Sequence, residues 1–124
     1  MKSHFLTFLF GFMLTVSGQI ALADTQLSEP KPSMDNPRQI VLALNTNDEA
    51  AVNNLLFNVV NIQKFYGQEN VEIAVVGYGA GVRNFLKSDS KVADRIQSLI
   101  LYDVQFVACG NTLDAIGRKR DELI

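Results

Sequence analysis

Cysteine and histidine, the side chains that most often act as nucleophiles, general bases or metal ligands, are almost absent from this sequence of 124 residues. Cys109 is the single cysteine, so an intramolecular disulfide and a Cys-x-x-Cys redox pair are excluded. His4 is the single histidine and lies in an N-terminal segment that we expect to be removed. A Cys–His nucleophile pair within one mature chain is therefore excluded. The carboxylates are scattered along the chain, and we expect neither a metal site nor a cofactor.

The sequence also lacks an excess of basic residues, since its net charge is -2 at pH 7. Nucleic acid is not an expected partner, because phosphate binding needs a concentrated cationic face. The densest basic run, Arg118-Lys119-Arg120, is followed at once by Asp121-Glu122, and we interpret it as a solvated segment. With 48% hydrophobic residues and no internal repeat, the composition predicts one ordinary globular domain.

The N-terminus has the pattern of a secretory leader. A short basic start at residues 1–4 precedes an apolar run at residues 5–16, and Ala21-Leu22-Ala23 supplies a small-x-small cleavage site. The pattern predicts a signal peptide over residues 1–23, cleaved after Ala23, and a periplasmic or secreted protein without membrane attachment. A retained membrane anchor is the alternative. It is less favoured, because residues 17–19 interrupt the apolar run, which barely reaches the ~20 apolar residues that a membrane span needs.

All three prolines fall within residues 24–38, among polar residues without apolar periodicity, which predicts a flexible linker. Residues 39–124 then form the predicted α/β domain. We expect strands at 39–44, 71–76 and 104–108, and helices at 49–66, after the glycine loop, at 91–101 and just before Gly117. The first strand is nearly all apolar, which predicts coverage on both faces, and we place the third strand buried at the centre of the sheet. Alternating strands and helices predict a parallel sheet with helices on both faces.

The first long helix should begin after Asp48 as N-cap and end at Gly67. Its apolar residues recur at helical spacing, but Phe57 and Phe65 fall on the asparagine-rich face. Two aromatic residues on a polar face suggest a contact between subunits. The alternative is that a neighbouring loop covers them.

Cys109 follows the third strand directly and precedes a short helix, for which Asn111 or Thr112 is the expected cap. The thiol would then lie at a helix N-terminus, where unpaired N–H groups favour a negative charge. The glycine loop Gly77-x-Gly79-x-Gly81 ends the second strand, so both features lie at the carboxyl edge of the sheet, where open α/β sheets bind ligands. The loop does not have the G-x-G-x-x-G spacing of dinucleotide sites, and we expect a structural role with N–H groups exposed near the thiol.

We therefore predict Cys109 as the catalytic residue, with binding residues that offer backbone N–H groups, a hydroxyl or a cation around it. These are Gly79, Gly81, Arg83, Gly110, Asn111 and Thr112. The dipole of a short helix alone changes the pKa of a thiol only a little, so a reactive Cys109 needs further stabilisation, for example from a nearby cation, and Arg83 is the one we expect. The competing interpretation is that Cys109 is a buried, inert side chain.

Residues 75–86 (VVGYGAGVRNFL) and 104–113 (VQFVACGNTL) resemble the DsrE/DsrF-like family, especially its small exported members. The resemblance implies a flavodoxin-like α/β fold, homo-oligomers that are often trimers or hexamers, and a sulfur relay in which the residue at Cys109 carries a persulfide. Two departures stand out. Asp103 replaces a common glycine before the third strand, and the family pattern continues past Ile124 into another strand. Either the chain is truncated after Ile124 or the domain lacks that last strand. In both cases we expect a domain that is short at its C-terminus and has one thinly covered side.

The sequence thus predicts a periplasmic sulfur-handling protein with Cys109 as nucleophile or persulfide carrier. Its partners would be further copies of the chain and a sulfur donor or acceptor protein. Whether it is an enzyme stays open, and an enzyme of this kind would be sulfurtransferase-like. The alternative function is a non-catalytic, oligomeric module that binds a small ligand and in which Cys109 is structural.

Overall fold

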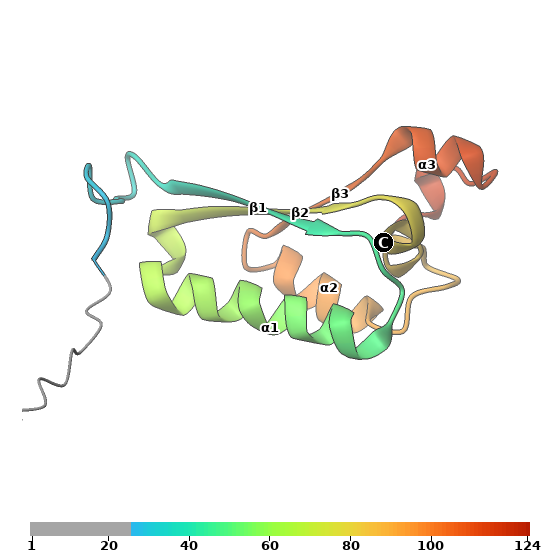
Figure 1. Cartoon of the computed structure of the whole chain (residues 1–124), viewed down its shortest axis with the longest axis horizontal. Helices are drawn as coiled ribbons and strands as arrows, with labels where there is room; N and C mark the ends of the chain where they lie inside the picture. Colours follow the sequence, from blue (N-terminus) through green and yellow to red (C-terminus); the bar gives the residue numbers. More distant parts are fainter. Residues whose placement is uncertain (1–25) are drawn as a thin grey trace, which may run out of the picture.

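The computed structural model describes residues 26–124, which fold into a three-stranded parallel sheet flanked by helices (Figure 1). The elements are, in chain order, β1 (Arg38–Leu44), α1 (Glu49–Tyr66), η1 (Gln68–Asn70), β2 (Val71–Gly77), η2 (Gly79–Phe85), α2 (Ala93–Ile100), β3 (Gln105–Ala108), α3 (Gly110–Ala115) and η3 (Arg120–Glu122), where η marks a 3-10 helix. This confirms the α/β class and is consistent with a flavodoxin-like fold. The predicted signal peptide lies outside the described residues.

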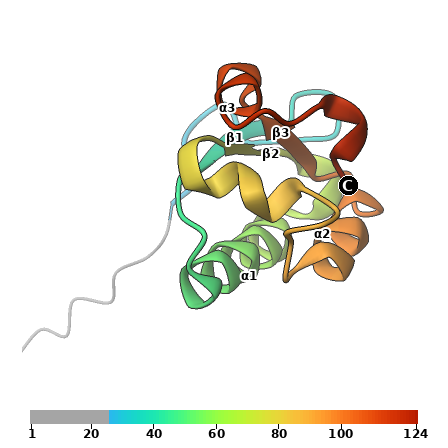
Figure 2. The same cartoon turned by 90° about the vertical axis from the view of Figure 1, so that its right-hand side faces the viewer.

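The long helix α1 forms where its sequence predicts. The carboxylate of Asp48 accepts a hydrogen bond from the Ala51 N–H at 2.8 Å, which caps the helix, and Gly67 ends it with φ of 86°. Its apolar face is buried against the sheet through Val52 and other aliphatic residues. The helices α1 and α2 both lie on this face of the sheet, and their packing forms the main core (Figures 1 and 2).

The arrangement of the strands differs from the prediction in two respects. The strand order is β1-β2-β3, so β2 is central and β3 is an edge strand. The strands β1 and β3 are also covered on one face only, since Val41 is 68% and Val107 is 44% exposed. The reason is that α3 lies on the opposite side from α1 and α2 but beyond the carboxyl ends of the strands, where it does not cover their outer face (Figure 1).

The outer face of the sheet, defined here by Val41, Ala43, Ala74, Val76 and Val107, carries small apolar side chains in register. Val41 pairs with Ala74, while Val76 lies between Ala43 and Val107. These positions are exposed or half-buried. An apolar strand in this chain therefore does not imply burial on both faces.

The turn before β3 has the backbone conformation that the resemblance implied. Asp103 adopts φ of 61°, in the left-handed region that usually selects glycine. Residues 100–103 are exposed, because α2 ends at Ile100 and the next residues form a turn. The helical spacing of apolar residues within 91–101 predicts an inward Ile100, and this prediction is wrong, because Ile100 is exposed. Among residues 26–124, no helix combines the length and hydropathy required to cross a membrane.

The segments before β1 and after α3 are tied to the domain by hydrogen bonds. The Arg38 guanidinium donates to the carbonyls of Ser28 and Pro30, at 3.1 and 3.2 Å. At the other end, Leu123 forms a β-bridge with Leu86, and the Ile124 N–H donates to the Phe85 carbonyl at 2.9 Å. The last residues therefore pack beside the end of η2.

Candidate functional site

The carboxyl ends of the three strands bring the glycine loop and Cys109 to one edge of the sheet, which faces the viewer in Figure 2. Two backbone hydrogen bonds extend the strand pairing past the ends of the strands. The Tyr78 N–H donates to the Leu44 carbonyl at 3.0 Å, and the Cys109 N–H donates to the Gly77 carbonyl at 2.8 Å. The predicted position of both features at this edge is confirmed.

Cys109 is itself the N-cap of α3, with φ of -66° and ψ of 117°. Its carbonyl accepts a hydrogen bond from the Leu113 N–H at 3.0 Å, while its side chain makes no capping bond. The prediction that Asn111 or Thr112 caps this helix was wrong, because the strand passes into the helix without an intervening turn. As a result the thiol is half-buried rather than enclosed in the core, and it is free.

The groups around the sulfur favour its charged form. The Thr112 side chain is the strongest of them, and by hydrogen bonding it lowers the pKa of the Cys109 thiol below its ordinary value. The backbone N–H groups of Thr112 and Asn111 lower this pKa further, whereas partial desolvation of the sulfur acts in the opposite direction. A thiol with this surrounding forms thiolate more readily than a free cysteine, and thiolate is the reactive species.

The glycine loop contributes to the same arrangement through Gly79. This residue adopts φ of 52°, and its N–H donates to the Thr112 Oγ1 at 3.2 Å. A hydroxyl has one hydrogen to donate and two lone pairs to accept with. Because the Gly79 N–H occupies only a lone pair of the Thr112 oxygen, the hydroxyl hydrogen of Thr112 stays available to the Cys109 sulfur. The structure thus brings Gly79 to Thr112, which is 33 residues later in the sequence and three residues after Cys109.

Three other predicted binding residues have different surroundings. Gly81 is buried, and a Cβ atom there would overlap the carbonyl of Leu44, so its role is to let the loop approach β1. Gly110 is exposed as the first residue of α3, with open space around it. Arg83 pairs with Asp89 at 3.0 Å and is not among the groups that lower the pKa of Cys109. The source of that shift is therefore Thr112 and Asn111.

Asn84 holds the loops of this edge in place, and sequence reasoning missed it. Its side chain is buried, and its amide nitrogen donates to the carbonyls of Thr46 at 2.9 Å and Gly81 at 3.0 Å. These two bonds join the β1–α1 loop to the glycine loop. A polar residue between the inward positions Val82, Phe85 and Leu86 was the available signal, since buried polar groups are retained where they are hydrogen-bonded.

The second missed feature is a cluster of charged side chains around Asp89, in the loop after η2. Arg118 donates to Asp89 at 2.6 Å and to Glu122 at 2.7 Å, and Arg83 pairs with the other oxygen of Asp89. The hydroxyl of Ser88, followed by the charges of Arg118 and Arg83, lowers the pKa of Asp89 against the opposing effect of desolvation. The interpretation of Arg118 as part of a solvated segment was therefore wrong, because its side chain joins η3 to the loop after η2.

Comparison with known proteins identifies the family and agrees with the fold. The model of the DsrE/DsrF-like family matches residues 19–124. Among solved structures, the chain is similar to MTH1491 from Methanobacterium thermoautotrophicum, described as a protein of unknown function, with 33% sequence identity and a TM-score of 0.66. The match covers 70% of this chain and 76% of that chain. No curated protein matches the sequence.

Proposed function

Because this chain belongs to the DsrE/DsrF-like family, we propose that it handles sulfur in the periplasm through Cys109, as a nucleophile or persulfide carrier. The observation that carries the proposal is the accessible thiol at the N-cap of α3, whose pKa is lowered by Thr112 and Asn111. A cysteine that only packs in the core needs neither this exposure nor polar neighbours that favour its thiolate. This favours the sulfur-carrier function over a module in which Cys109 only packs.

The proposed step is a transfer of sulfane sulfur by thiolate exchange. The Cys109 thiolate attacks the terminal sulfur of a donor persulfide, R–S–SH, and forms a new S–S bond. The S–S bond of the donor breaks at the same time, and its electron pair leaves on the donor thiolate, R–S⁻. No net oxidation occurs, because the sulfane sulfur only changes its carrier. Delivery to an acceptor thiolate is the same reaction with Cys109 as the leaving group, for which a lowered pKa is favourable.

Intact-mass spectrometry after incubation with glutathione persulfide tests this proposal. We expect one added sulfur atom on the protein, located at Cys109 by peptide mapping, and its release by an acceptor thiol. The Cys109→Ser variant is the control and should gain none. If the thiol reacts with iodoacetamide only after unfolding, Cys109 is a structural residue and the sulfur-carrier function is refuted.

The location is proposed from the leader pattern, which lies outside the described residues. Cleavage after Ala23 would give a mature protein that begins at Asp24. N-terminal sequencing of the protein recovered from a periplasmic extract should find Asp24 first. Recovery of the chain with Met1 in the membrane fraction would contradict export and cleavage.

We also propose that the protein is a homo-oligomer, a trimer or hexamer by the family resemblance. Its support is that Phe57 and Phe65 are 58% and 53% exposed within residues 26–124, so no loop of this part covers them. Replacing both residues with serine should leave a folded chain of lower mass in light scattering. A wild-type protein that is already monomeric would refute the proposal.

A further inference from the structure

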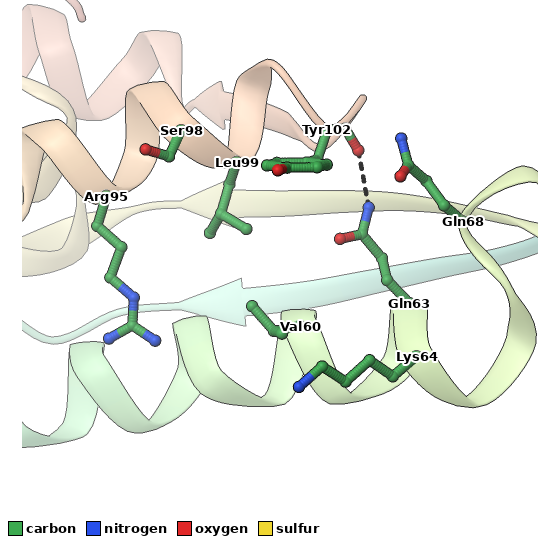
Figure 3. Close-up of a pocket in the computed structure, with 8 residues that line it drawn as sticks. All are labelled: Val60, Gln63, Lys64, Gln68, Arg95, Ser98, Leu99 and Tyr102. Carbon is green, nitrogen blue, oxygen red and sulfur yellow. Dashed lines mark hydrogen bonds between the residues drawn. The ribbon is translucent and has the colours of Figure 1, made fainter.

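A groove separate from the cysteine site lies between α1 and α2, on the helical side of the sheet (Figure 3). It has a volume of about 460 Å³, within the range of small-ligand pockets. Val60 and Leu99 form its apolar floor between the two helices, and the ring of Tyr102 extends along one side (Figure 3). The Gln63 side chain donates to the Tyr102 carbonyl at 2.7 Å and so fixes that side of the groove.

The charges at the groove all have one sign. Lys64 projects from α1 and Arg95 from α2, and no carboxylate lines the groove, although the chain as a whole is acidic. Within residues 26–124, neither cation forms an ion pair. The Arg95 guanidinium donates to the side-chain oxygen Oδ1 of Asn53 at 2.7 Å and lies over the ring of Phe57, whose centre is 4.0 Å away.

We propose that this groove binds a small amphiphilic anion, with a flat apolar body and one carboxylate or sulfonate group. The apolar body would lie over Val60 and Leu99 beside the Tyr102 ring, and the acid group would lie between Lys64 and Arg95. Burial of the apolar body supplies affinity, and the two unpaired cations select for negative charge. Because Arg95 is already positioned by neutral partners, the anion displaces no competing carboxylate. The proposal does not depend on the reactivity of Cys109.

Two fluorescent probes with the same rings test the site on the full chain: anilinonaphthalene sulfonate and the neutral anilinonaphthalene. We expect the sulfonate to bind one per chain and more tightly than the neutral probe. Lys64→Gln and Arg95→Gln should each raise the Kd of the sulfonate about fivefold, which is about 1 kcal/mol at 1.4 kcal/mol per tenfold. The same variants should leave the Kd of the neutral probe unchanged.

Two further variants and a spectrum locate the binding. Lys91→Gln removes the same charge from the loop just before α2 without lining the groove, and it should leave both Kd values unchanged. Ser98→Trp fills the groove from an exposed position and should abolish binding of both probes. In amide NMR spectra, the probe should shift residues 60–68 and 95–102.

Several outcomes would overturn the proposal. Equal affinity for the two probes would show that the groove does not select for negative charge. An unchanged Kd in Ser98→Trp, or amide shifts confined to the outer face of the sheet, would show that the probe binds outside the groove. If the probe bound only after an oligomer had dissociated, a second copy of the chain would be covering the groove, and this would also refute a ligand site.

Discussion

Asn84 offers the most direct test of how the edge of the sheet is held together. Replacing it with alanine removes both hydrogen bonds from its amide to the carbonyls of Thr46 and Gly81. A buried acceptor that loses its partner costs about 1–3 kcal/mol. The bond to Gly81 is buried and the bond to Thr46 is part-buried, and both come from one side chain, so the two losses do not add fully. We expect the free energy of unfolding to fall by about 2–4 kcal/mol. This is a large part of the 5–15 kcal/mol typical of a domain.

Urea denaturation followed by circular dichroism measures this loss. The slope of the free energy against urea should stay the same, since the surface exposed on unfolding is unchanged. Asn58→Ala on the exposed face of α1 is the matched control, and it should change stability by no more than about 0.5 kcal/mol. In Asn84→Ala, hydrogen exchange of the Gly79 amide should also accelerate, because the glycine loop is less restrained. A loss no larger than that of the control would refute the role of Asn84.

Three other changes test the thiol and the loop beside it. Thr112→Val removes the hydroxyl that lowers the pKa of Cys109, so the alkylation rate should rise at a higher pH than in the wild type. Thr112→Ser should keep the wild-type profile, and an unchanged profile in Thr112→Val would contradict this origin of the shift. Arg83→Ala should leave the profile unchanged, because its guanidinium is engaged elsewhere. Gly81→Ala forces a Cβ atom against the β1 backbone and should cost about 1–3 kcal/mol in thermal or urea unfolding, whereas Gly110→Ala, in open space, should not.

The order and type of the elements were predictable because they depend on local chemistry. Asp48 and Gly67 set the ends of α1 through a carboxylate cap and a positive φ, and both signals are visible in the sequence. Gly117, with φ of 67°, likewise follows the end of α3. The position of each strand in the sheet was not predictable in the same way, because an apolar run is compatible with an edge or a central strand. The coverage of each face depends on where distant helices pack, which a single strand does not encode.

In the candidate site, too, the features set by local sequence were predictable and those set by long-range contacts were not. The position of Cys109 at a strand–helix junction followed from the pattern of the sequence, and so did its proximity to the glycine loop. The bond from the Gly79 N–H to the Thr112 hydroxyl joins residues on different loops, and no local signal selects it. Arg83 was expected to lower the pKa of the thiol, but its guanidinium pairs instead with Asp89, six residues later in the chain. Long-range hydrogen bonds thus decide which of several plausible donors acts on the thiol.

The exposed outer face of the sheet has a consequence for how the stability of the domain changes with temperature. The heat capacity change of unfolding comes mainly from apolar area that the folded state hides from water, typically 12–15 cal/mol/K per residue in compact domains. Here Val41, Val107 and their neighbours are already hydrated in the folded chain, so they contribute little to it. Calorimetry should therefore give a heat capacity change below about 12 cal/mol/K per residue and a correspondingly flat curve of stability against temperature.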